Sequence, residues 1–145
     1  MRLVVDASVI VAICYAGGEL GRLRGHELHA PALLPAEVTS SIREAVYRGE
    51  VPLAQAAGAL ERLAGLLLTY DTPGAHALDA FTLAEQLGWA KTYDAEYVVL
   101  ARALDAPLVT LDGRLQRGAA GVARVIGPAA TEAEPPVAAV LERRR

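Results

Sequence analysis

The sequence of 145 residues has one cysteine, Cys14, which excludes a scaffold built on disulfides. A lone cysteine in an apolar stretch is typical of a buried thiol in a reducing compartment. The chain also lacks any run of about 20 uncharged apolar residues, and its start shows no signal peptide with a cleavage site. We therefore expect a cytoplasmic protein that does not enter a membrane.

An excess of positive charge is missing as well. The 14 lysine and arginine residues are outnumbered by 17 aspartate and glutamate residues, and the net charge is -3. This balance excludes a protein that coats nucleic acid without specificity, but it allows a nuclease with an acidic site and an arginine rim. Hydrophobic residues make up 53% of the chain, which excludes disorder along most of its length.

Strand-like and helix-like segments alternate along the chain, because short apolar runs are separated by longer stretches with helical spacing of apolar residues. This pattern predicts strands at residues 2–5, 28–34, 66–70, 107–111 and 122–126. It predicts helices at residues 7–15, 37–48, 51–63, 75–87, 93–104 and 137–143. Such alternation predicts an α/β fold with a central parallel sheet of about five strands. We expect one domain over residues 1–127, followed by a linker and a short basic helix or tail over residues 128–145.

Four acidic residues stand where predicted strands end or predicted helices begin. Asp6 and Asp112 follow the first and fourth strands, whereas Glu37 and Asp94 lie at the starts of helices. The carboxyl ends of parallel strands share one edge of a sheet, where ligands bind, so the four carboxylates can converge there. The alternative is that each acid separately caps a helix or occupies a turn, as acidic residues at a helix start often do.

A cluster of carboxylates is unfavourable without a cation. Two carboxylates about 4 Å apart repel by roughly 4 kcal/mol at an effective dielectric constant near 20. Mg²⁺ and Mn²⁺ prefer oxygen ligands and would remove this repulsion. A metal ion in such a site can orient a phosphodiester, lower the pKa of a bound water and stabilise the leaving oxygen.

Four short motifs that contain these acids occur in a fixed order along the chain. They are Val4-Val5-Asp6-Ala7-Ser8-Val9, Pro35-Ala36-Glu37-Val38, Tyr93-Asp94-Ala95-Glu96-Tyr97 and Leu108-Val109-Thr110-Leu111-Asp112. Each motif is weak by itself. Together, over residues 1–127, the chain resembles the PIN-domain ribonuclease family, and within it the VapC toxins of bacterial and archaeal toxin–antitoxin pairs.

The resemblance implies a three-layer α/β/α fold and an endoribonuclease that depends on Mg²⁺ or Mn²⁺. The residues that match the family's acidic tetrad, which would be both catalytic and metal-binding, are Asp6, Glu37, Asp94 and Asp112. Those that match its supporting hydroxyls are Ser8 and Thr110. One departure is visible: many VapC sequences have asparagine three residues after the glutamate, and this chain has Ser40 there. Any contact made by that asparagine side chain is in doubt here, but the metal site is not.

The resemblance also implies three partners, namely an RNA substrate, a cognate antitoxin and a second copy of the chain. An arginine of the antitoxin inserted among the carboxylates would block the site, since guanidinium pairs bidentately with carboxylate. We expect a homodimer because small PIN toxins commonly pair. The predicted helices at residues 52–64 and 75–87 carry enough apolar residues for an exposed face.

Two arginines and two tyrosines lie near the acidic motifs. Arg114 and Arg117 closely follow Asp112 and are candidate contacts for RNA. Tyr93 and Tyr97 are interpreted as core residues rather than as platforms on which bases stack.

Three other functions fit the sequence less well than a ribonuclease does. A phosphatase of the haloacid dehalogenase class also places an acid after its first strand, but its signature has a second aspartate where this chain has Ser8. A response-regulator receiver needs a lysine at a late strand end, whereas Lys91, the only lysine, precedes a helix. A catalytically inert PIN-like module that binds RNA or organises an assembly would have no need of four acids.

Overall fold

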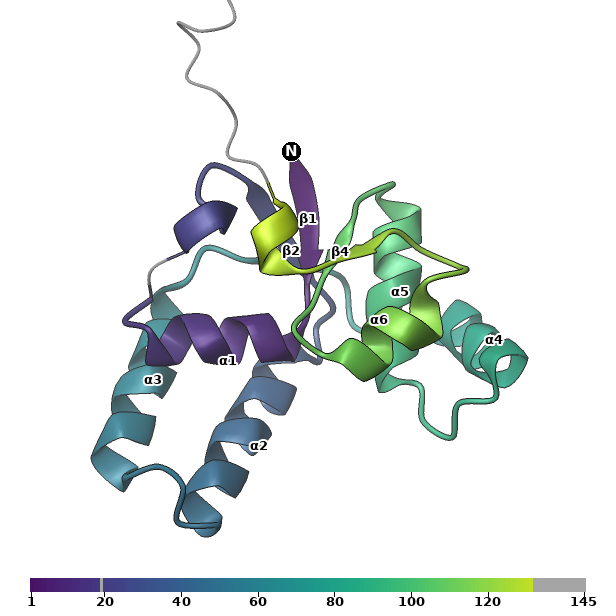
Figure 1. Ribbon diagram of the computed structural model, residues 1–145. Coiled ribbons are helices and arrows are strands. Elements are labelled where there is room, and N and C mark those ends of the chain that lie inside the picture. Colours follow the sequence, from purple (N-terminus) through teal and green to yellow (C-terminus); the bar gives the residue numbers. More distant parts are fainter. Residues whose placement is uncertain (19, 132–145) are drawn as a thin grey trace, which may run out of the picture.

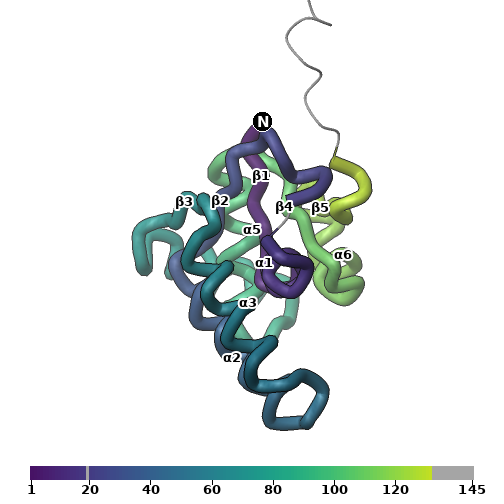
Figure 2. Tube along the Cα trace, turned by 90° about the vertical axis from the view of Figure 1, so that its left-hand side faces the viewer, coloured from purple at the N-terminus to yellow at the C-terminus, as the bar shows by residue number. Residues whose placement is uncertain are grey.

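Five parallel strands form the centre of the computed structural model, which describes residues 1–18 and 20–131 (Figure 1). The strands are β1 (Arg2–Val5), β2 (Glu27–Ala30), β3 (Thr69–Tyr70), β4 (Leu108–Val109) and β5 (Val125–Ile126). Every neighbouring pair is parallel, and Figure 2 shows the order β3-β2-β1-β4-β5 from left to right. The predicted parallel sheet is confirmed.

Helices cover both faces of this sheet. Those of the described residues are α1 (Ala7–Tyr15), α2 (Leu34–Tyr47), α3 (Leu53–Gly65), α4 (Ala77–Leu87), α5 (Tyr93–Ala103) and α6 (Gly113–Ala119), with short 3₁₀ helices η1 (Gly21–Leu23) and η2 (Pro128–Ala130). In Figure 1, α1, α2 and α3 lie on one side of the sheet, and α4 and α5 lie on the other. This arrangement confirms the three-layer α/β/α fold.

The core surrounds β1, the central strand. Leu3, Val4 and Val5 are fully buried, as expected of a strand whose two faces are both covered. Helix α5 packs directly on β1 and β4 and is itself covered by α4, while α1 packs against α2 and α3. Among the fully buried side chains the largest is Tyr97 of α5. Cys14 is a buried free thiol, as predicted.

Four of the five predicted strands are longer in the sequence pattern than in the structure, and β2 and β3 show the reason. β2 ends at Ala30 because the next residue, Pro31, has no N–H for the ladder. The apolar residues that follow instead lead into α2, which begins at Leu34 with Pro35 in its first turn. β3 is an edge strand that pairs only over its two residues, so most of the apolar run at 66–70 connects α3 to the sheet.

Helix α6 is absent from the sequence prediction. Its segment contains Gly113 and Gly118, which lower helix propensity, so the pattern after Asp112 indicates a loop. The Asp112 side chain compensates for this low helix propensity, because it accepts hydrogen bonds from backbone N–H groups in the first turn of the helix. The helix predicted at residues 137–143 lies outside the described residues. Within residues 1–18 and 20–131, no helix is both long and apolar enough to cross a membrane.

Candidate active site

Asp6 is a carboxyl group that is almost fully buried. It follows β1, caps the start of α1, and is 6% exposed. Its Oδ1 accepts hydrogen bonds from the Ser8 hydroxyl at 2.6 Å and from the Val9 N–H at 3.2 Å, and its Oδ2 accepts one from the Thr110 hydroxyl. These donors compensate for the water that the carboxylate has lost.

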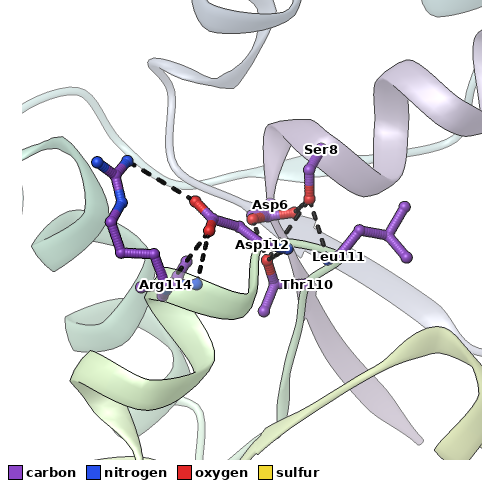
Figure 3. Close-up of polar contacts among 7 residues, drawn as sticks. Asp6, Ser8, Thr110, Leu111, Asp112 and Arg114 are labelled. Atoms are coloured by element: carbon purple, nitrogen blue, oxygen red, sulfur yellow. Dashed lines mark hydrogen bonds and ion pairs between the residues drawn. The ribbon is translucent and has the colours of Figure 1, made fainter.

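The two hydroxyls also tie the end of β1 to the segment after β4 (Figure 3). The Ser8 hydroxyl accepts a hydrogen bond from the Leu111 N–H at 3.1 Å, and the Thr110 hydroxyl accepts one from the Asp112 N–H at 2.9 Å. Each hydroxyl therefore donates to Asp6 and accepts from the backbone that leads into α6. The position of Asp112 relative to Asp6 is fixed by this network.

Asp112 caps α6 and is partly exposed. Its Oδ1 accepts hydrogen bonds from the backbone N–H groups of Arg114 at 2.8 Å and Leu115 at 3.4 Å. Its Oδ2 lies 3.9 Å from Nη2 of Arg114, whose side chain is 84% exposed. A capping carboxylate at a helix start is stabilised by the positive end of the helix dipole.

Glu37 is held by a tyrosine from another helix. It lies in the first turn of α2, and its Oε1 accepts a 2.7 Å hydrogen bond from the hydroxyl of Tyr97. Tyr97 is 1% exposed, so the prediction that it belongs to the core is confirmed. The sequence does not predict the hydrogen bond from Tyr97 to Glu37. Helical spacing places Tyr97, three residues after Asp94, on the same side of α5, but it does not identify Glu37 as the partner.

Asp94 lies in the first turn of α5 and is half-buried. Each acid of the predicted tetrad thus lies at the start of a different helix, namely α1, α2, α5 or α6. The structure gives every one of these acids the separate helix-terminal position that the alternative interpretation required. The interactions between the acids decide whether they also form one site.

The carboxylates interact electrostatically with one another. Burial raises the pKa of Asp6, and nearby Asp112 raises it further, against the effect of the hydrogen bonds to Asp6. Burial raises the pKa of Glu37, the Tyr97 hydrogen bond opposes this, and Asp94 and Asp6 add to it. The pKa of Asp94 is likewise raised, first by burial and then by Asp112 and Asp6, while Arg114 opposes the shift. Because these influences link all four acids, they form one electrostatic group and not four isolated caps.

The chemistry of this group suits a hard divalent cation, because every donor is a carboxylate or hydroxyl oxygen. The side chains do not form a closed ligand shell: in the described part of the chain, no three or more His, Cys, Asp or Glu side chains are grouped closely enough to hold a metal ion. Mg²⁺ usually takes only one or two carboxylates and keeps several waters, so a looser group of carboxylates fits it.

A pocket of about 530 Å³ opens beside the acids, and Glu37, Asp94 and Arg114 contribute to its wall. Arg117 is not among the residues that line this pocket; its guanidinium lies back against Gly113 on α6. The pocket wall also includes Tyr93, whose side chain is 56% exposed. The interpretation of Tyr93 as a core residue is therefore wrong, because this first residue of α5 lines the pocket and is exposed.

Comparison with known proteins agrees with this geometry. A family model described as PIN domain matches residues 3–121. Ribonuclease VapC1 of Mycobacterium tuberculosis is 41% identical over 118 residues, which cover 77% of this chain and 86% of the relative. PAE2754 from Pyrobaculum aerophilum has a similar structure with a TM-score of 0.67, at 23% identity over 99% of this chain and 88% of its own. VapBC2 from Rickettsia felis, solved with a DNA fragment from its promoter, gives a TM-score of 0.59 at 16% identity, over 88% of this chain and 98% of that chain.

The chain therefore belongs to the PIN domain family, and within that family its sequence groups with the VapC proteins. The two solved structures share its fold.

Exchange of Asp94 for asparagine should stabilise the metal-free protein at pH 8. One charge is removed while the shape is kept, and we expect a gain of about 1–2 kcal/mol, the scale of carboxylate repulsion after solvent screening. Because the pKa of Asp94 is raised in the folded protein, the repulsion operates above that pKa and disappears as the carboxyl is protonated. The gain should therefore shrink as the pH falls towards about 4, near the ordinary pKa of aspartate. Denaturant unfolding in EDTA at several pH values measures it.

The matched control for this experiment is Asp79→Asn, which removes an exposed acid from the first turn of α4. Loss of an isolated helix-terminal charge should destabilise slightly or change nothing. If Asp94→Asn behaves like Asp79→Asn at every pH, the carboxylates are independent caps and the electrostatic group does not exist.

Exchange of Tyr97 for phenylalanine should raise the pKa of Glu37 further. The hydroxyl donates to the charged carboxylate and so favours ionisation, and its removal leaves burial and the neighbouring acids unopposed. Titration of the Glu37 carboxyl carbon by NMR in the metal-free protein measures this shift. Tyr47→Phe, which removes the hydroxyl of a tyrosine that is 81% exposed on the same helix as Glu37, should leave the titration unchanged. An unaltered Glu37 titration in Tyr97→Phe would show that the hydrogen bond has no influence on this acid.

Proposed function

We propose that the protein is an endoribonuclease that hydrolyses RNA phosphodiester bonds with the help of Mg²⁺ or Mn²⁺, and that it is the toxin of a VapBC toxin–antitoxin pair. The observation that carries the proposal is that acids at the starts of four different helices gather beside one open pocket, whose wall includes Glu37 and Asp94. Burial and neighbouring acids raise the pKa of three of them, Asp6, Glu37 and Asp94. Relatives named ribonuclease VapC support the choice of RNA as substrate.

The residues that would hold the metal are Asp6, Glu37, Asp94 and Asp112. When bound, such an ion supplies positive charge to the phosphodiester and lowers the pKa of a bound water. The chain's own contribution is to keep these acids in place. Ser8 and Thr110 orient Asp6 through its two carboxylate oxygens, and the Tyr97 hydroxyl orients Glu37. A raised pKa also brings the Glu37 carboxylate closer to the operating pH, where it can accept a proton from the attacking water.

The competing functions find less support. The position of the second aspartate in a haloacid dehalogenase phosphatase is taken by Ser8, which donates its hydroxyl to Asp6. An inert RNA-binding module has no use for buried carboxylates that repel one another, because each raises the free energy of the folded state unless a cation compensates it.

Arg114 indicates how a protein partner would block this site. Its guanidinium already lies beside Asp112 and opposes the rise in the pKa of Asp94, so the acids accommodate a guanidinium in their neighbourhood. We propose a cognate antitoxin that inserts an arginine in the same way. In the absence of the antitoxin, Arg114 would turn to a phosphate of the RNA, with the exposed Arg117 extending this basic edge along α6.

We make two further proposals, one on the domain boundary and one on the location of the protein in the cell. The first is that residues 1–127 form the nuclease domain. Of the predicted linker and basic helix or tail at residues 128–145, Pro128–Ala130 form η2 and Thr131 is buried, and the rest lies outside the described residues. The protein acts in the cytoplasm, because that is where an RNA-cleaving toxin meets its substrate.

We expect the purified protein to cleave single-stranded RNA in Mg²⁺ or Mn²⁺ and to be inactive in excess EDTA. Asp112→Asn should reduce the cleavage rate by at least about 100-fold, since a partly exposed acid is lost from the site without a change of shape. A gel assay with a labelled oligonucleotide measures this, with Asp79→Asn as the control that keeps full activity. Cleavage that persists in EDTA, or para-nitrophenyl phosphate hydrolysis without RNA cleavage, would contradict the proposal.

We also propose a homodimer, formed through α4. Leu78 and Phe81 lie three residues apart on this helix and are 76% and 62% exposed, so they form one apolar strip. Light scattering at micromolar concentration should give the mass of a dimer. The double exchange of Leu78 and Phe81 for serine should give a monomer, whereas Leu67→Ser, at a leucine that is 93% exposed elsewhere, should not. A monomeric parent protein would refute this proposal.

A further inference from the structure

The pocket beside the acids has a second wall that the proposed chemistry does not use. Besides Glu37 and Asp94, its lining includes Trp89, Lys91, Tyr93 and Arg114. Two aromatic rings and two cations therefore share one cavity with two acids of the tetrad. Its volume of about 530 Å³ falls in the range of about 300–1,000 Å³ that is common for small-ligand sites.

Trp89 is a tightly packed part of this pocket wall. The turn after α4 is made by Gly88 in the left-handed conformation, with a φ of 70°, and the Trp89 N–H donates to the Ala84 carbonyl at 2.8 Å. The indole ring packs so closely on α6 that a Cβ added to Gly118 would lie 3.0 Å from its Cζ2. The ring is thus held between the end of α4 and α6.

Tyr93 supplies an aromatic ring that solvent can reach. It is the first residue of α5, directly before Asp94, and it is 56% exposed although its ring is large. Its side chain lines the pocket instead of packing into the core. An accessible ring next to an acidic centre is a surface on which an unpaired base can stack.

The two cations balance the charge of the pocket. A cavity lined by Glu37 and Asp94 alone would repel a phosphodiester. Lys91 and Arg114 offset this, and Nη2 of Arg114 lies 3.9 Å from Oδ2 of Asp112. A ligand that offers both a flat ring and a phosphate matches all parts of this wall, and a nucleotide is such a ligand.

We infer that this pocket binds one unpaired nucleotide of the RNA next to the bond that is cleaved, with Tyr93 stacking on the base and with Lys91 and Arg114 contacting phosphates. The inference rests on the proposed ribonuclease function, and it assigns the selection of single-stranded RNA to this site. A base within a duplex is stacked and paired, so it cannot enter the pocket without being released first.

A protein partner is the competing occupant, because an aromatic pocket also accepts apolar side chains. Lys91 and Arg114 favour RNA. Their positive charges attract the phosphates of a nucleotide, whereas an apolar side chain gains nothing from them.

Substitution of Tyr93 tests the inference. Binding of a fluorescein-labelled single-stranded RNA oligonucleotide to the full chain is measured by anisotropy in EDTA, and KM for its cleavage is measured in Mg²⁺. Tyr93→Leu should weaken binding by about 5- to 100-fold, the range found when a stacking aromatic is removed, whereas Tyr93→Phe should stay within about twofold of the parent. Tyr47→Leu, at a tyrosine 81% exposed on the far part of α2, is the matched control and should change neither quantity.

A series of oligonucleotides with one abasic position gives a second measurement. The parent should lose affinity when the base that enters the pocket is missing, and Tyr93→Leu should be insensitive to the same loss. Lys91→Gln should reduce the slope of log K against log salt by about one, as expected for one phosphate contact.

The outcomes separate the pocket from the proposed function. If the parent cleaves RNA while Tyr93→Leu binds and cleaves it as the parent does, the nuclease remains and the pocket assignment is wrong. If the parent binds RNA through Tyr93 but never cleaves it, the pocket assignment holds and the nuclease proposal fails. If Tyr93→Leu loses affinity for a peptide of the antitoxin but keeps its affinity for RNA, the pocket belongs to the protein partner and the inference is overturned.

Discussion

Four carboxylates that repel one another, partly withdrawn from water beside one pocket, are the feature on which the rest of this structure depends. Burial and mutual repulsion both raise the pKa of Asp6, Glu37 and Asp94. A protein keeps such groups together only if other interactions hold them there. The three donors to Asp6, the backbone donors to Asp112 and the Tyr97 hydroxyl on Glu37 serve this purpose.

The parallel sheet makes this arrangement possible. Each strand runs in the same direction, so the helices that follow β1, β2 and β4 begin at one edge and bring the positive ends of their dipoles to it. A helix start favours a carboxylate by itself, and several such starts tolerate a group of carboxylates better than any one would. The same geometry explains why Asp6 and Asp112 are at once helix caps and members of the acidic group. The capping role and the role in the site are not alternatives.

Helix α5 combines three different tasks within five residues. Tyr93 faces the open pocket, Asp94 joins the acidic group, and Tyr97 is buried while its hydroxyl reaches Glu37 on α2. The helical repeat does not separate these tasks, because positions 93 and 97, four residues apart, share a face of the helix just as positions 94 and 97 do. Tyr93 is the first residue of α5 and lines the pocket, whereas Tyr97 lies one turn further along and is buried in the core. A small domain can thus place a buried support, a carboxylate and an exposed ring side by side without any additional loop.

Much of this organisation is readable in the sequence because it depends on local patterns. Short apolar runs, helical spacing and turn residues predict the alternation of strands and helices, and an acid after a strand or at a helix start predicts which edge carries the chemistry. The four acids could be named in this way, whereas Ser8 and Thr110 were named only through the resemblance to the PIN-domain ribonuclease family. Helix α6 could not, because its glycines indicate a loop and only the cap formed by Asp112 reverses that preference.

Contacts between distant segments were decided by the tertiary structure alone. The side chains of Tyr93 and Tyr97 are four residues apart in one helix, and nothing in their local sequence tells that one faces solvent and the other bonds to Glu37, 60 positions away. The same holds for Thr110, whose hydroxyl reaches Asp6 across 104 positions. The sequence by itself determined which residues have the chemistry for a site and at which edge of the sheet they stand, since these follow from side-chain type and local periodicity. Which of them touch, and which neighbours share the pocket, was decided by the packing of α2, α5 and α6 around that edge.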